Sequence, residues 1–229
     1  MKTLNLALFA GLALAAPLAA HAGLSARAWL ETYYLNPEPA KLPEEIQRLS
    51  REGYFNEPGS VPIAIGFIST IFARHPDQVD GWLLQLNGLP LKDQKLIASA
   101  LWQAGHPLGP ELLERLSEYS RNRAEVTRLA NTPSMAVDDT PVLSPASMNF
   151  RWGAFLATGD RRHIVAILDA IGRDEPGFDA AARRTLATLA ATHPRVLEIC
   201  RAELARQPND VPSELRAALL SVTQVHPRT

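Results

Sequence analysis

The segment VPIAIGFISTIFA, residues 61–73, holds no charged side chain and would be apolar on most sides of a helix. A helix of this kind is buried in the interior of a protein rather than lying on its surface. We therefore predict a central helix over residues 61–73. It ends at His75-Pro76, because the residue before a proline is disfavoured in the helical region of backbone space.

Outward from this segment, apolar residues recur at spacings of three and four and are interrupted at short intervals by proline and glycine. This period is typical of amphipathic helices, and almost no stretch alternates as a strand would. The sequence thus predicts an all-α fold. We expect eleven helices, at about residues 25–34, 43–52, 61–73, 79–86, 91–105, 109–130, 146–158, 161–172, 178–192, 194–206 and 212–225.

The corners between these helices repeat a local pattern, seen at His75-Pro76 and again at His193-Pro194. We predict stacked antiparallel helix hairpins, with a short superhelical, repeat-like array as the extended form of this arrangement. Residues 132–144 are rich in Pro, Ser, Thr and Asp and lack a helical period, which indicates a loop or linker. It separates an N-terminal helical half, residues 23–131, from a C-terminal helical half, residues 145–229. Whether the halves share one core stays open.

The first residues have the features of an export signal. Lys2 precedes an apolar stretch over residues 6–19, and the small-residue motif Ala20-His21-Ala22 follows it. We predict a signal peptide over residues 1–22, cleaved after Ala22, and therefore a periplasmic or secreted protein. Cys200 is the one cysteine, so no internal disulfide can form, and its place in an apolar stripe predicts a buried side chain.

Charge and hydropathy limit the kinds of partner. The chain has 23 basic and 24 acidic residues, a net charge of -1, and so lacks the excess of cations that binding to nucleic acid requires. No run beyond the leader reaches the ~20 apolar residues that cross a bilayer, so no membrane span is expected. The sequence does not indicate an oligomeric state.

Four of the five histidines after the leader immediately precede proline: His75, His106, His193 and His226. These positions favour helix ends, where an imidazole interacts well with the C-terminal dipole. The alternative is a metal site in which His75 and His193 meet along one edge with a carboxylate such as Asp77. Since no histidine pair has the spacing of a helical zinc site, we assign no metal and no cofactor.

Signatures of catalysis are missing from the sequence. It contains no Gly-x-Ser-x-Gly elbow, no His-Glu-x-x-His and no glycine-rich phosphate loop. Asp138-Asp139 resembles a catalytic carboxylate pair, but adjacent loop residues need not converge, and we interpret both as loop residues. These absences count modestly against an enzyme, and no catalytic residue is assigned.

Trp29, Tyr33 and Tyr34 lie together on the first helix after the leader. One short helix cannot turn all three rings inward if its neighbour covers a single face. Because aromatic side chains with a polar tip are favoured at interfaces, these three residues are the candidate protein interface. The alternative is ordinary packing of the first helix onto the second and third.

Three short motifs, YYLNPEP at residues 33–39, ALW at residues 100–102 and WGAFLATGD at residues 152–160, resemble uncharacterised secreted helical proteins of proteobacteria. The resemblance implies no activity. We hypothesise an exported helical scaffold that binds another protein, as an adaptor, chaperone-like or immunity-type protein. One alternative is an envelope enzyme that acts on the cell wall with carboxylates from separate helices. Another is a carrier of apolar ligands, with a cavity lined by Ile65, Phe67, Ile68 and Phe72.

Overall fold

The computed structural model describes residues 25–119, 123–171, 178–207 and 214–224. These residues form twelve α-helices and five short 3-10 helices, and they contain no β-strand. The predicted all-α fold is confirmed. The predicted signal peptide, residues 1–22, lies outside the described residues.

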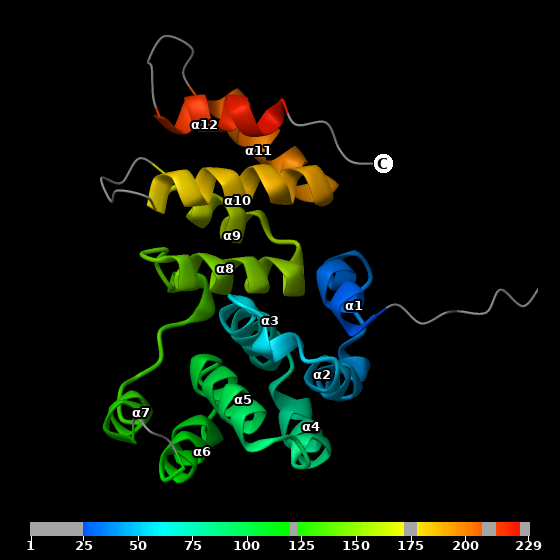
Figure 1. Ribbon diagram of the computed structural model, residues 1–229, viewed down its shortest axis with the longest axis vertical. Helices are drawn as coiled ribbons and strands as arrows, with labels where there is room; N and C mark the ends of the chain where they lie inside the picture. The colour runs from blue at the N-terminus through cyan, green and yellow to red at the C-terminus, as the bar shows by residue number, and fades with distance from the viewer. Residues whose placement is uncertain (1–24, 120–122, 172–177, 208–213, 225–229) are drawn as a thin grey trace, which may run out of the picture.

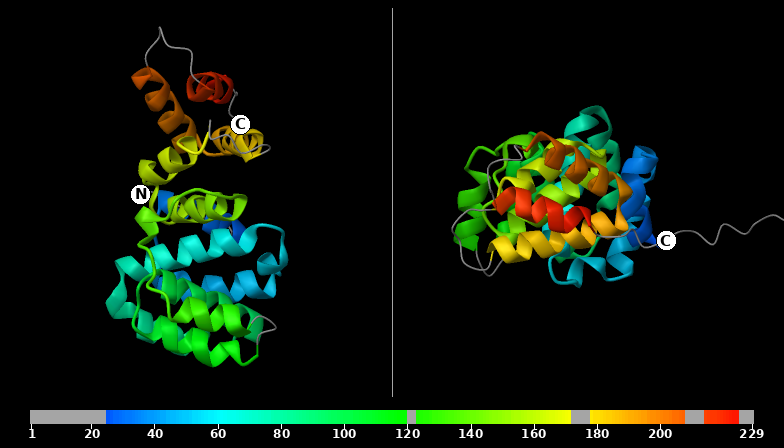
Figure 2. Two further views of the ribbon diagram at one scale, coloured as in Figure 1. Left: turned by 90° about the vertical axis from the view of Figure 1, so that its left-hand side faces the viewer. Right: turned by 90° about the horizontal axis from the view of Figure 1, so that it is seen from above.

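The helices stack along the long axis of the molecule (Figure 1). α12 and α11 lie at one end, α10, α9, α8 and α3 follow, and α5, α6 and α4 lie at the other end. Figure 2 shows the same layers from the side. The bounds are α1 Ala26–Thr32, α2 Leu42–Arg51, α3 Ser60–Arg74, α4 Val79–Leu86, α5 Leu91–Gln103, α6 Leu108–Ser117, α7 Arg123–Ala130, α8 Pro145–Thr158, α9 Arg161–Leu168, α10 Phe178–Thr192, α11 Pro194–Arg206 and α12 Glu214–Thr223.

The centre of the stack is the crossing of α3 and α8, where two glycines face the partner backbone. A Cβ atom added to Gly66 would lie 2.0 Å from the carbonyl oxygen of Phe150, and one added to Gly153 would lie 2.0 Å from that of Ile63. No side chain fits in such a space, so glycine at both positions allows the helix backbones to touch. The predicted central helix is confirmed as α3, which runs from Ser60 to Arg74.

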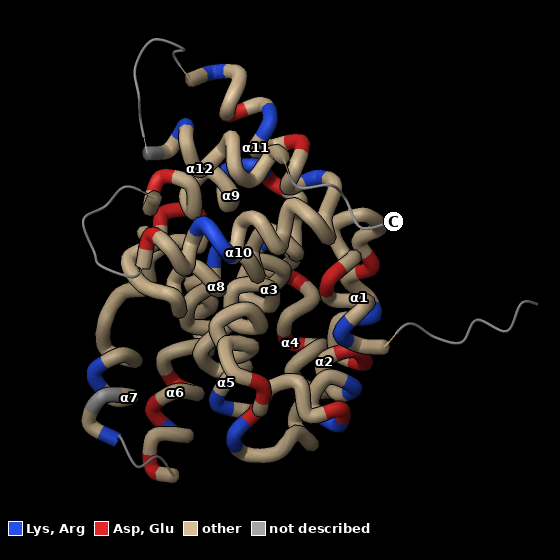
Figure 3. The backbone as a smooth tube through the Cα atoms, turned by 45° about the horizontal axis from the view of Figure 1, so that its top comes forward, with Lys and Arg blue, Asp and Glu red and all other residues tan. Residues whose placement is uncertain are grey.

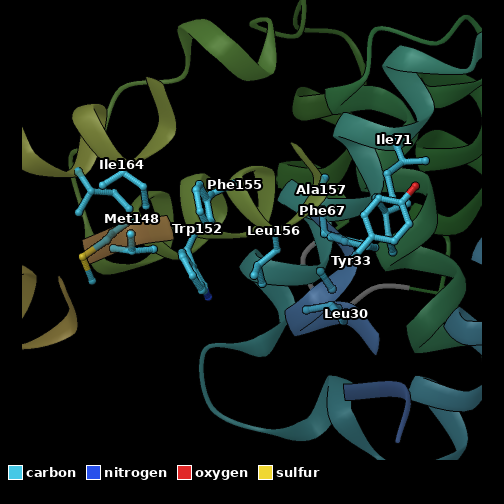
Figure 4. Packing of buried hydrophobic residues seen from close by; sticks show 14 of the residues in the cluster. Leu30, Tyr33, Phe67, Ile71, Met148, Trp152, Phe155, Leu156, Ala157 and Ile164 are labelled. Carbon is cyan, nitrogen blue, oxygen red and sulfur yellow. The ribbon is translucent and has the colours of Figure 1, made fainter. Parts of the chain in front are cut away.

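The core spans the linker. Phe67 of α3 and Phe155 of α8 are completely buried and belong to one continuous apolar cluster, which reaches from α1 to α12. Figure 4 shows part of this cluster, with side chains contributed from both sides of the linker. The N-terminal and C-terminal halves thus share one core.

The predicted helix over residues 109–130 is wrong as a single element. The chain forms α6 and α7 instead, and the two pack side by side, so that twelve helices replace the expected eleven. Leu116 and Ala130 belong to the same small apolar cluster. In one straight helix they would be about 21 Å apart, which means that the chain must fold back between them for both apolar stripes to be buried.

Candidate functional site

The end of the stack opposite α12 carries an apolar groove with a volume of about 420 Å³. α5 forms its floor, and α4 and α6 form its two walls. We call it the leucine groove, after its apolar lining residues Leu83, Leu86, Ile97, Leu108, Leu112 and Leu116.

The groove is open because each wall helix buries one face and leaves a second apolar face at its side. α4 buries Trp82 and Leu86 against the core, while Leu83 is half-buried and Leu84 is 74% exposed. α6 buries Leu113, whereas Leu108 is 36% exposed. A large contiguous apolar patch marks a candidate site for a ligand or a partner, whereas single exposed leucines are common on protein surfaces.

Polar and charged groups line the remainder of the groove. Near the corner between α4 and α5, Gln94 donates a hydrogen bond from Nε2 to the carbonyl oxygen of Leu89 at 2.8 Å. Glu111 and Arg115 of α6 also line the groove, and both side chains are exposed. Glu111 and Arg115 further line a neighbouring cavity of about 450 Å³ between α6 and α7, so α6 forms a charged ridge between two hollows.

A second candidate site is a buried polar cluster where the linker meets α8 and α9. Arg151 of α8 donates from Nε to the carbonyl oxygen of Thr140 at 2.7 Å and from Nη2 to that of Asp138 at 2.6 Å. Its Nη1 lies 3.3 Å from Nδ1 of His163. Both the Arg151 and His163 side chains are buried. We refer to Arg151, His163, Asp138 and Thr140 as the Arg151 cluster.

The charge state of His163 follows from these contacts. A guanidinium can only donate, so Nδ1 of His163 accepts and the neutral ring carries its proton on Nε2, which lies 3.8 Å from Oδ1 of Asp138. Burial and the neighbouring Arg151 lower the pKa of His163 to about 4, and burial also lowers the pKa of Arg151. The cluster is therefore a clamp that holds two linker carbonyls against the C-terminal half.

The candidate interface residues Trp29 and Tyr33 are buried in the core. Their rings pack edge to face with each other at 5.1 Å and with Phe67 at 5.6 and 5.1 Å, respectively. Tyr34 is half-buried, with its ring 5.1 Å from that of Phe155 and 6.1 Å from that of His193. The aromatic interface stays a prediction, and only Tyr34 of the three offers much surface to it.

Of the four histidines before proline, three lie at helix ends as expected, namely His75, His106 and His193, and His226 lies outside the described residues. The backbone N–H of His75 closes α3 by bonding to the carbonyl oxygens of Ile71 and Phe72, and His193 precedes α11. The ring of His75 packs against Trp82, whereas that of His193 packs against Trp152. Among the described residues, no group of three His, Cys, Asp or Glu side chains is arranged to hold a metal ion.

Asp138 and Asp139 lie on a short 3-10 helix of the linker, Val137–Asp139. Asp138 forms an ion pair with Arg162 and also lines a cavity of about 390 Å³ at the ends of α3 and α5. Arg74 lines the same cavity, which contains a single carboxylate and so lacks the paired carboxylates that the enzyme hypothesis expects.

The apolar-carrier hypothesis expects a cavity lined by Ile65, Phe67, Ile68 and Phe72. Ile65 is half-buried and packs against the core, and the other three side chains are buried by close neighbours. Trp29 and Tyr33 pack against Phe67, and the ring of Trp82 stacks on Phe72. None of these residues lines any of the three cavities described above, and none lines a fourth cavity beside Trp102.

Sequence reasoning missed both sites. Arg151 is the only charge among the apolar residues of α8, and His163 is the one histidine after the leader that does not precede proline. Both features signalled a buried polar pair. Adjacent leucines, such as Leu83 with Leu84, hinted that the wall helices have two apolar faces.

The fold and the groove define a class: an all-α protein of stacked helices with an open apolar groove at one end. No protein-family model matches the chain, and no curated protein and no solved structure is significantly similar to it. None of the described helices is both long and apolar enough to cross a membrane.

Proposed function

We propose that the protein is an exported helical scaffold that binds another protein, and that the leucine groove is its binding surface. The observation that carries this proposal is an open groove lined mainly by leucines, in which Leu108 stays 36% exposed and Leu83 half-buried, with Leu84 exposed next to Leu83 in the sequence. Export follows from the predicted signal peptide over residues 1–22.

The energetics favour a protein partner. Covering a fully exposed leucine side chain contributes roughly 1.5 to 3 kcal/mol, which applies to Leu84, whereas Leu83 and Leu108 are already partly buried and contribute less.

The test is crosslinking of the tagged protein in its native cells, followed by mass spectrometry. It compares the wild type with the double variant Leu84→Ser/Leu108→Ser. Leu35→Ser is the matched control, because Leu35 is 67% exposed and lies outside the groove. We expect one dominant partner, captured by the wild type and by Leu35→Ser and lost in the double variant.

Two other results would contradict the proposal. Recovery of no protein partner would remove the scaffold function itself. Capture that persists in the groove variant but is lost in Tyr34→Ala would move the binding surface to the first helix.

A further inference from the structure

The buried arginine and the buried histidine of the Arg151 cluster lie in contact with each other. Charged positions are distributed along the stack of helices (Figure 3). Among the described residues, however, Arg151 is the only Lys or Arg that is buried, and His163 is the only buried histidine. Nη1 of Arg151 lies 3.3 Å from Nδ1 of His163. Two groups that can each carry a positive charge are thus held together away from water.

This contact requires that His163 be neutral. The guanidinium of Arg151 keeps its charge and can only donate, so Nδ1 of His163 must offer a free lone pair. A proton on Nδ1 would set two donors against each other and place two cations in contact inside the protein. Because burial and a neighbouring like charge both disfavour a charged group, we expect protonation of His163 to separate the two side chains.

The other charged groups around His163 do not remove this conflict. From the linker, Oδ1 of Asp138 lies 3.8 Å from Nε2 of His163 and favours the protonated ring, but Asp138 is exposed and also pairs with Arg162. On α9 itself, Asp160 favours the protonated ring and Arg162 opposes it. α11 also packs on α9, and its Glu203 pairs with arginines instead. Burial and the guanidinium outweigh the carboxylates, which lowers the pKa of His163 to about 4.

Arg151 also ties the linker to α8. Its Nε and Nη2 donate to the carbonyl oxygens of Thr140 and Asp138 at 2.7 and 2.6 Å. The same stretch of linker, through Val137 and Asp138, forms one side of the cavity of about 390 Å³, and the ends of α3 and α5 form the other side. Displacement of Arg151 would therefore free one wall of this cavity.

We propose that the Arg151 cluster is an acid-sensitive latch: protonation of His163 displaces Arg151, and linker residues 137–140 then move away from α8 while the helical core stays folded. This inference goes beyond the proposed function and does not depend on the leucine groove. It predicts a latch that is fully closed above about pH 6.5, the ordinary pKa of a histidine, and that weakens as the pH falls towards 4.

The test is hydrogen exchange of the purified protein at pH values between 7 and 4, read by mass spectrometry of its peptides. Protection factors are compared, because they divide out the pH dependence of the intrinsic exchange rate. The amides of Asp139 and Thr140 both bond to the carbonyl oxygen of Ala136. From the lowered pKa of His163, we expect their protection at pH 4 to fall roughly 10- to 100-fold below its value at pH 7. Protection of α3, at the centre of the core, should persist.

Three variants identify the group that titrates. His163→Asn keeps an acceptor for Arg151 and should abolish the fall in protection. His193→Asn is the matched control, because burial lowers the pKa of His193 as well but its ring packs away from the linker, so the fall should remain. Asp138→Asn removes a carboxylate that raises the pKa of His163 and should shift the response to lower pH. Since Asp138 is exposed, this variant keeps the test decisive even if His163→Asn does not fold.

Unchanged protection of the linker at pH 4 would overturn the latch. Loss of protection in α3 at the same pH as in the linker would also overturn it, because the chain would then unfold as a whole. A response that persists in His163→Asn and disappears in Asp138→Asn would assign the titration to the linker carboxylate and remove the role of His163.

Discussion

The α3–α8 crossing and the α4–α5–α6 end are both built from largely apolar helices, yet they differ in how completely they are covered. At the crossing, Gly66 and Gly153 bring the backbones into contact, and the surrounding side chains are buried. At the end, Leu84 and Leu108 stay in contact with solvent beside an open groove. Apolar composition alone therefore does not distinguish a closed structural contact from a surface available to a partner.

The difference predicts opposite sensitivities to substitution. Close packing in the interior makes the crossing sensitive to a single added methyl group. Substitutions at the open end should hardly change the free energy of unfolding and should change only the affinity for a partner. The following substitutions test this contrast.

The largest effect is expected from Gly153→Ala. Its Cβ would overlap the backbone of α3, so α3 and α8 must separate, and we expect a loss of about 3 kcal/mol or more in the free energy of unfolding. The matched control is Gly81→Ala on α4, where a Cβ meets nothing within 4 Å. There alanine should stabilise the helix by up to about 1 kcal/mol. Urea denaturation of both variants measures the difference, and equal behaviour would contradict the close crossing.

Arg151→Met should cost about 2 to 3 kcal/mol, because it leaves the carbonyl oxygens of Asp138 and Thr140 without their donor. Arg162→Met is the control. Its guanidinium is exposed and pairs with the exposed Asp138 and the half-buried Asp160, so its loss should cost no more than about 1 kcal/mol. Hydrogen exchange of the linker amides would show whether residues 137–140 detach in Arg151→Met alone. Similar protection in both variants would refute the clamp.

Acid should weaken the Arg151 cluster through His163. Its pKa is lowered to about 4 in the folded protein, so the unfolded chain binds the proton first. The contribution of the neutral His163 ring to the free energy of unfolding is then fully present above about pH 6.5. The free energy of unfolding falls by between about 1 and 3 kcal/mol as the pH drops towards 4. His163→Asn keeps an acceptor for Arg151 and removes this titration. Unfolding measured against pH should flatten in His163→Asn, although His193, whose pKa burial also lowers, adds a residual slope. An unchanged slope would exclude His163 as its source.

The smallest effect on stability is expected at the groove. Leu84→Ser should change the free energy of unfolding by no more than about 0.5 kcal/mol, because the side chain is already exposed. Leu101→Ala, on the buried face of α5, should cost about 2 to 5 kcal/mol. Thermal unfolding of the two variants measures how much each of these leucines contributes to the stability of the fold. A large loss in Leu84→Ser would mean that Leu84 supports the fold rather than a partner.

Local patterns in the sequence determined a large part of the fold. The uncharged segment at residues 61–73 predicted the buried α3, and the prolines after His75 and His193 predicted helix ends. Cys200 is buried as its apolar stripe indicated. These features depend on neighbours within a few turns of the same helix, which a sequence displays directly.

Only the tertiary structure decided the rest. The fold-back between α6 and α7, the backbone contact at Gly66 and Gly153, and the capture of the linker by Arg151 each join residues distant in the chain. The leucine groove likewise forms only when α4, α5 and α6 pack beside one another. A helical stripe reports that a face is apolar, but whether that face is covered depends on which helices pack beside it, and this is set by contacts that no local period encodes.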